Sequence, residues 1–307
     1  MDSIAITIAS FIGIITLGVT AGRRGLVGSG GSELISRIVF NITLPAAIIH
    51  AFGSVAFDPT HLLLVPVGVA CTFGPFLIGV LATRNTDVHD RRLYLLNIGG
   101  FNIGCFALPF VQALFPPAAV VAACMFDAGN ALLMAGGSFA LTQVITADEP
   151  PAHPVLGIVK RLLTSIPFVA YLSLIALALL NIRVPLEIVS LIEPVSNANA
   201  FLSLFMLGLM INFSADRSKL GKLMKLLSGR FLLSALMCTA VILFLPFEGQ
   251  VLLVIAILTW APMATMGTVF TLWANEDYGL AGLANSITVV IGIIAMTLLS
   301  VVGPTLL

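Results

Sequence analysis

Charged residues are scarce in this sequence. Its 307 residues include 14 basic and 14 acidic ones, or 9% of the chain, against roughly a quarter in an ordinary soluble domain. So few charges cannot cover the surface of a soluble domain of this length. A mean hydropathy of +1.12 also excludes an intrinsically disordered chain. The net charge is zero, so no nucleic-acid partner is expected.

Cysteine and histidine are equally few. The four cysteines lie inside apolar runs at unrelated spacings, without a Cys-x-x-Cys pair, and the four histidines are scattered. Neither a disulfide framework nor a metal site follows from such spacings. We therefore expect no metal and no cofactor.

What the chain does have is long apolar runs. A helix that crosses a bilayer needs about 20 mostly apolar residues, and ten such runs are separated by charges or turn residues. They cover residues 4–21, 36–55, 61–82, 93–114, 118–144, 157–180, 189–213, 230–246, 249–273 and 279–304. The expected fold class is an all-α polytopic membrane protein with ten transmembrane helices.

The basic residues lie almost entirely on one side of this topology. Lys and Arg accumulate in cytoplasmic connections, and all of them except Arg183 fall in or beside the odd-numbered connections. This distribution predicts a multi-pass protein of the inner (plasma) membrane with both termini outside the cytoplasm.

The chain divides into two halves of five spans, 1–146 and 155–307. An odd number of spans inverts the second half relative to the first. The fourth span of each half carries helix breakers at membrane depth: Asn, Gly and Pro109 within 97–109, and Pro262 and Gly267 within 259–267. Proline removes a backbone donor and glycine weakens a helix. We predict that spans four and nine are discontinuous and cross; two simply kinked helices are the alternative.

Crossing broken helices would bring half-helix N-termini to the centre of the membrane. Such ends carry free N–H groups and a partial positive charge, so they can hold a carboxylate without an arginine. This matters because the predicted spans place no Lys or Arg near their middle.

At these residues the sequence resembles the auxin efflux carrier family, which includes plant auxin exporters and bacterial malonate- and malate-type carriers. The resemblance extends over the whole chain through five short motifs in order. They are Phe40-Asn-Ile-Thr-Leu-Pro45, Phe101-Asn-Ile-Gly104 through Pro109 to Phe115, Leu204-Phe-Met-Leu-Gly208, Ala261-Pro262, and Tyr278-Gly279 through Ala284-Asn-Ser286.

The resemblance implies an inverted-repeat carrier similar in architecture to sodium/proton antiporters and bile-acid symporters. Helices 1, 2, 6 and 7 would form a scaffold, and helices 3–5 and 8–10 a moving core. A homodimer through helices 2 and 7 is implied as well. The crossover prolines of the family correspond to Pro109 and Pro262, and its span-four asparagine to Asn102.

Asp127 is the only acidic residue near the middle of a predicted span. An ionised carboxylate there costs at least about 2.5 kcal/mol, so we expect it to be protonated, ion-bound or hydrogen-bonded to the broken helices. Asn130 lies on the same helical face, and Asn285 and Thr288 repeat the spacing in span ten. We predict that these four residues surround the crossover and that Asp127 binds a coupling H⁺ or Na⁺. Neutralisation of the positive half-helix ends is the alternative role.

The predicted function is secondary transport of a small organic anion, a monovalent or partly apolar carboxylate, by alternating access. The substrate is expected to contact Asn102, Gly104, Pro109, Pro262 and Thr265 on the broken spans. Asn41 and Asn199 are candidates for the scaffold side of the cavity, with interhelical hydrogen bonding as their alternative role. A passive channel or a ligand sensor on the same fold is the alternative function. A membrane-embedded enzyme is disfavoured, because its chemistry needs two facing titratable groups or a metal.

Overall fold

The computed structural model describes residues 2–28, 30–147, 154–211, 213 and 216–305, and within these ranges the protein is helical. The first half contains α1 (Asp2–Arg23), α2 (Gly31–Ile38), η1 (Val39–Thr43), α3 (Leu44–Gly53), η2 (Pro59–Leu63), α4 (Leu64–Ala82), α5 (Val88–Ile98), η3 (Ile103–Ala107), α6 (Leu108–Leu114), α7 (Pro117–Leu132), η4 (Leu133–Gly137) and α8 (Ser138–Thr146).

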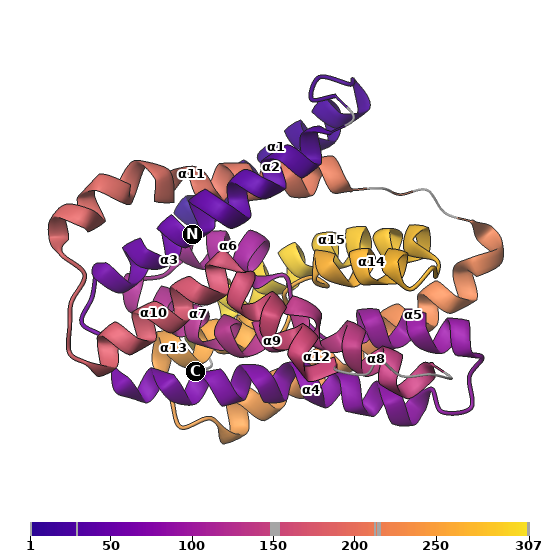
Figure 1. Cartoon of the computed structure of the whole chain (residues 1–307). Helices are drawn as coiled ribbons and strands as arrows, with labels where there is room; N and C mark the ends of the chain where they lie inside the picture. Colours follow the sequence, from indigo (N-terminus) through magenta and orange to yellow (C-terminus); the bar gives the residue numbers. More distant parts are fainter. Residues whose placement is uncertain (1, 29, 148–153, 212, 214–215, 306–307) are drawn as a thin grey trace.

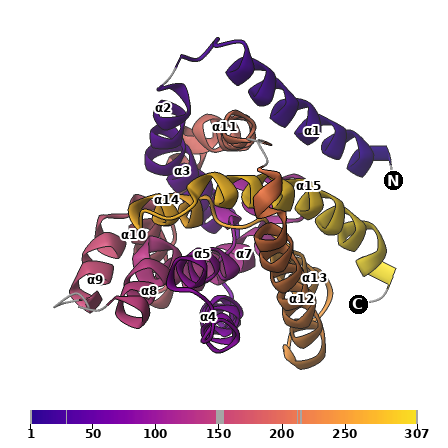
Figure 2. The same ribbon diagram turned by 90° about the vertical axis from the view of Figure 1, so that its right-hand side faces the viewer.

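The second half begins with an amphipathic helix. It contains α9 (Pro154–Thr164), α10 (Ile166–Leu179), α11 (Leu186–Met210), η5 (Arg217–Lys219), α12 (Leu220–Phe244), α13 (Gly249–Leu258), α14 (Thr265–Trp273), α15 (Tyr278–Val302) and η6 (Gly303–Thr305). In Figure 1, α1, α2 and α11 form one edge of the bundle and α4 the opposite edge, with α5, α14 and α15 between them. Figure 2 views the same bundle from its right-hand end.

Within the described ranges, seven helices are long and apolar enough to cross a membrane, and eight if the bent pair α9 and α10 counts as one span. The sequence predicts ten spans. The other two predicted spans, 93–114 and 249–273, are interrupted: the first contains α5, η3 and α6, and the second contains α13 and α14. Each piece of these two segments is too short to cross a membrane by itself, as expected for discontinuous helices.

Two pairs of helices pack with their backbones in contact. On α4 and α7, a Cβ atom at Gly68 would overlap the carbonyl oxygen of Phe126, and one at Gly129 would overlap that of Val65. On α1 and α11, Gly18 and Gly208 have the same relation to backbone atoms of the opposite helix. Small residues allow helices in a membrane to approach this closely, and the first contact fixes the position of α7, which carries Asp127.

Helix α12 corrects the predicted boundary of span eight. It begins at Leu220 rather than near residue 230, because its first turns present Leu223, Leu226 and Leu227 to the core. Arg230 therefore lies within a membrane helix and is only 3% exposed. The expectation that no basic side chain lies near the middle of a span is wrong.

Candidate functional site

The first interruption separates α5 from η3. Helix α5 ends at Ile98, and Gly100 takes a φ of +77°, a conformation that costs a residue with a Cβ more than it costs glycine. The helix resumes as the widened turn η3, and α6 follows directly with Pro109 as its second residue. Proline cannot donate to the preceding turn, and π-type turns of this kind occur frequently at functional sites.

The second interruption separates α13 from α14, and it meets the first. Helix α13 ends at Leu258 and α14 begins at Thr265. Phe101 and Met263 form an antiparallel β-bridge, and the N–H of Asn102 donates to the carbonyl oxygen of Pro262 at 2.9 Å. Backbone groups without a helical partner need another one inside a membrane, and here the two interruptions supply it to each other.

Side chains from α7 and α15 complete this pairing. The carboxamide of Asn130 bonds both backbone groups of Phe101: its Oδ1 accepts from the N–H at 3.0 Å, and its Nδ2 donates to the carbonyl at 2.9 Å. Thr288 Oγ1 accepts from the N–H of Met263 at 3.1 Å. Asn130 and Thr288 thus each bond the bridge residue of their own half, Asn130 through two hydrogen bonds and Thr288 through one.

Replacing Asn130 with alanine is expected to destabilise the protein. Both polar groups of Phe101 would lose their partner, at a cost of about 3 kcal/mol. The near-isosteric variant Thr288→Val removes one acceptor and should cost about 1 kcal/mol. Melting temperatures in detergent measure both, and equal shifts for the two variants would contradict the role of Asn130 described here.

Asp127 is 8% exposed and has two donors. Its Oδ1 accepts from Asn130 Nδ2 at 2.9 Å, and its Oδ2 accepts from the hydroxyl of Tyr171 at 2.7 Å. A Cβ added to Gly104 would lie 3.7 Å from Oδ2, so the carboxyl group lies against the first turn of η3. This is the positive end of the half-helix formed by η3 and α6, where a carboxylate is favoured.

A cavity of about 660 Å³ adjoins these groups. It lies between the first interruption, α2, the start of α14, the junction of α9 and α10, and the end of α11. Six of the predicted site residues line it: Asn41, Asn102, Gly104, Asp127, Asn130 and Thr265. Asn102 Nδ2 also donates to Thr265 Oγ1 at 3.0 Å, which links the two interruptions through side chains.

The remaining predicted site residues lie elsewhere. Pro109 lines a separate hollow of about 310 Å³, and the ring of Pro262 packs against Gly292 of α15. Asn199 is fully buried and accepts a hydrogen bond from Thr43 at 3.0 Å, which is the interhelical role left open by the sequence. Asn285 is buried, and among the described residues its Oδ1 has no partner.

Two residues that sequence reasoning missed are part of the cavity wall. Tyr171 is 1% exposed and holds Asp127; a tyrosine in the middle of an apolar helix needs a partner for its hydroxyl, and this was the available signal. Arg161 reaches the cavity because α9 and α10 meet at an angle of 81°. Its guanidinium lies 4.9 Å from the ring centre of Trp273 and 5.8 Å from that of Phe139.

The charges around the cavity are few. Among the described residues that line it, Asp127 and Arg161 are the only charged ones. Within the described part of the chain, Arg161 forms no ion pair with a carboxylate. Counting only the residues that the structure describes, the cavity therefore holds one acid with its donors in place and one cation without a carboxylate partner.

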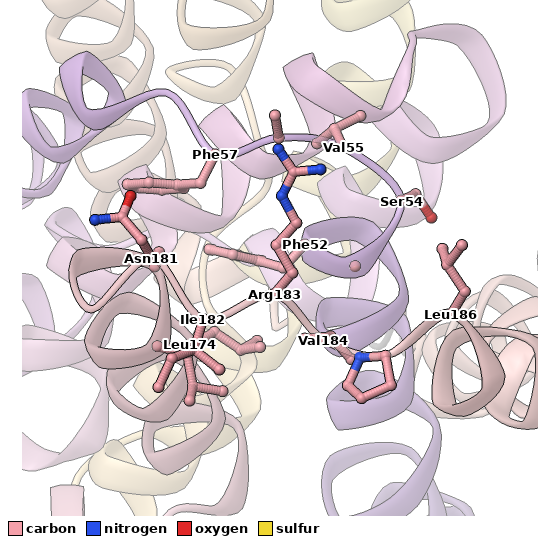
Figure 3. Close-up of a pocket in the computed structure, with 15 residues that line it drawn as sticks. Phe52, Ser54, Val55, Phe57, Leu174, Asn181, Ile182, Arg183, Val184 and Leu186 are labelled. Carbon is pink, nitrogen blue, oxygen red and sulfur yellow. The ribbon is translucent and has the colours of Figure 1, made fainter.

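A further hollow of about 500 Å³ lies where the segment after α3 meets the connection between α10 and α11. Figure 3 shows it with Arg183, Asn181 and Phe57 on its wall. In Figure 1, the connection between α3 and η2 lies at the left end of the bundle, and the connection between α4 and α5 lies at the right end.

Comparison with known families identifies the family of this chain. The family model described as membrane transport protein matches residues 3–301. The chain belongs to this membrane transport protein family. The match confirms the resemblance to the auxin efflux carriers seen in the motifs, and no individual curated protein matches the chain.

Membership of the membrane transport protein family gives the interruptions a context. Discontinuous helices at the centre of a membrane are typical of secondary transporters. The family that matches is a family of transporters and not of enzymes. Together with the apolar helices, it identifies the protein as an integral multi-pass membrane protein.

Proposed function

We propose that this membrane transport protein is a secondary transporter of a small organic anion and that the 660 Å³ cavity is its binding site. The observation that carries the proposal is the difference between the two charged residues that line the cavity. Asp127 already has two donors, whereas Arg161 has no carboxylate partner among the described residues. One carboxylate from the substrate would complete this arrangement, because guanidinium groups bind carboxylates in a fork geometry.

The rest of the lining favours a substrate that is partly apolar. Four methionines face the cavity: Met134, Met206, Met210 and Met266. Methionine adapts its shape to different apolar ligands. Asn41, Asn102 and Thr265 offer a small polar area at the same site. A monocarboxylate with an apolar body and one or two further polar atoms suits this wall better than a tricarboxylate.

Alternating access is supported by the thin layer between the cavity and the hollow around Pro109. On α3, Leu44 lines the cavity and His50 lines the hollow, about 9 Å apart along the helix. On the segment η3 and α6, Cys105 lines the cavity and Pro109 lines the hollow, about 6 Å apart along the helix. Ala47, Ile48, Ala107 and Leu108 fill the layer and are fully buried. A small displacement of one helix group against the other would transfer the substrate between the two sides.

The proposed moving parts follow the two halves of the chain. Predicted spans three to five and eight to ten would move against a scaffold of spans one, two, six and seven. The two domains would be residues 1–146 and the inverted repeat 155–307. The matching roles of Asn130 and Thr288 support an inverted repeat. A homodimer through α2, α3 and α11 remains part of the proposal, as does a coupling H⁺ or Na⁺ at Asp127.

We place the protein in the inner (plasma) membrane, with both termini outside the cytoplasm. In Figure 1, α1 begins and α15 ends at the left end of the bundle. The C-terminal end of α1 points away from that end, towards the upper right, and the connection between α4 and α5 lies at the right end; Arg23 ends α1 and Arg84 lies in that connection. Basic connections are retained on the cytoplasmic side.

Uptake into liposomes tests the function. Purified protein is reconstituted, and uptake of a panel of radiolabelled mono-, di- and tricarboxylates is measured under imposed H⁺ or Na⁺ gradients. We expect saturable uptake of a partly apolar monocarboxylate. Flux that does not saturate would indicate a channel, binding without flux a sensor, and transport restricted to cations or neutral solutes would contradict the proposal.

The variant Arg161→Gln tests the site. Loss of a charge-assisted hydrogen bond should raise the KM for uptake about tenfold or more, and Arg161→Lys should lie between it and the wild type. Arg183→Gln is the matched control, because Arg183 lines the separate hollow of Figure 3 and its loss should leave the KM unchanged. An unchanged KM in Arg161→Gln would remove Arg161 from the substrate site.

A further inference from the structure

Arg230 is a buried cation outside the cavity. It is the eleventh residue of α12 and is 3% exposed. Its Nη1 donates to the carbonyl oxygen of Ile98 at 2.9 Å, and its Nη2 donates to that of Ala261 at 3.3 Å. The guanidinium also lies 4.5 Å from the ring centre of Phe101. One side chain therefore contacts both interruptions.

Both carbonyl groups lie at an interruption, one at the last residue of α5 and the other in the segment that follows α13. Ile98 is the last residue of α5 and directly precedes Gly99 and Gly100. Ala261 follows the end of α13 and directly precedes Pro262. The C-terminal end of a helix carries a partial negative charge and unpaired carbonyl oxygens. A cation that donates to both ends satisfies them together.

The polar contacts of Arg230 are made to backbone carbonyl groups. Among the described residues, no carboxylate forms an ion pair with it. Burying a charge in a membrane helix is costly unless polar groups compensate it, and here the compensation comes from the two interruptions. Arg230 is also absent from the described lining of the cavity, so it does not touch a substrate bound there.

We propose that Arg230 is a positioning residue that fastens the two interruptions to each other and to α12, so that they move as one body. It holds the carbonyl group of Ile98 at the end of α5 and that of Ala261 in the segment after α13, while Asp127 lies against the positive end of η3. Phe101, which stacks on Arg230, lines the cavity, so the clamp also fixes part of the cavity wall. This inference does not depend on the identity of the substrate.

Hydrogen–deuterium exchange in detergent tests the clamp. The reporters are peptides that contain the amides of Phe101, Asn102 and Met263, whose bonds hold the interruptions together. In Arg230→Gln we expect these amides to exchange about tenfold faster, as the loss of charge-assisted bonds implies. Amides of α1 and α11, which lie on the other edge of the bundle in Figure 1, should keep their wild-type rates.

Two further variants keep the test decisive. Arg230→Lys retains the charge but not the planar fork, so its reporters should also exchange faster than in the wild type. Arg92→Gln is the matched control, since Arg92 donates to the carbonyl oxygen of Thr146 at 3.0 Å, away from the interruptions; its reporters should be unchanged.

Two results would overturn the proposal. Wild-type exchange at both interruptions in Arg230→Lys would show that the two guanidinium bonds do not fasten the interruptions, and this arm decides the question even if the glutamine variant does not fold. Equal acceleration of reporters and distant helices would show a general loss of stability. A failure of carboxylate uptake would overturn the proposed function and leave these rates unaffected.

Discussion

Replacing Asp127 with asparagine is expected to abolish accumulation of the anion against its gradient. The variant has nearly the shape of the wild type, and its carboxamide can still accept from Tyr171 or Asn130, so the fold should persist. What it lacks is a group that binds and releases a proton or pairs with Na⁺. We therefore expect at least about a hundredfold loss of gradient-driven uptake, within the range for loss of an essential proton-transfer group.

The measurement compares two modes of transport in the same liposomes. Uptake driven by an imposed H⁺ or Na⁺ gradient should disappear in Asp127→Asn, while exchange of labelled for unlabelled substrate at equilibrium should continue. Tyr171→Phe is the matched control, because it removes one donor to the carboxylate and keeps the titratable group. If Asp127→Asn folds and still accumulates substrate, Asp127 only neutralises the positive end of η3.

Replacing Gly68 with leucine is expected to destabilise the native bundle strongly. A side chain at Gly68 meets the carbonyl oxygen of Phe126, a backbone atom that cannot turn away, so α4 and α7 would have to separate. The cost should reach about 3 kcal/mol, the upper end of the usual range for overpacking. The displacement would also move α7, with Asp127 and Asn130, away from the interruptions.

The control for this variant lies on the same helix. A Cβ at Gly74 meets no heavy atom within 4 Å, so Gly74→Leu should change stability by less than about 0.5 kcal/mol. Size-exclusion profiles and melting temperatures in detergent distinguish the two variants. A monodisperse Gly68→Leu protein that melts with the wild type would show that α4 and α7 do not depend on this contact.

Much of the site was predictable because its residues break a local rule. Asn, Gly and Pro at the centre of an apolar run are costly in a lipid bilayer, and this cost identified both interruptions. The same reasoning selected Asp127 and Asn130 from their depth and spacing, and Asn102 and Thr265 line the cavity. For these residues, the position along the helix alone carried the information.

What the sequence did not predict depends on direction and distance. Both Pro109 and Asn199 lie on helices next to the cavity, but their side chains lie in another hollow or another contact. A nearly uniform apolar helix gives little indication of which face points inward. Arg161 and Arg230 looked like members of basic connections, and only the bend between α9 and α10 and the early start of α12 place them inside.

The shared backbone pairing has a consequence for biogenesis. The N–H of Asn102 finds its acceptor on Pro262, which is synthesised only when most of the chain has already entered the membrane. Until then, the backbone N–H of Asn102, in the fourth predicted span, lacks its acceptor. The N-terminal half therefore cannot complete this backbone pairing before Pro262 has been synthesised, and the two halves complete their folding together.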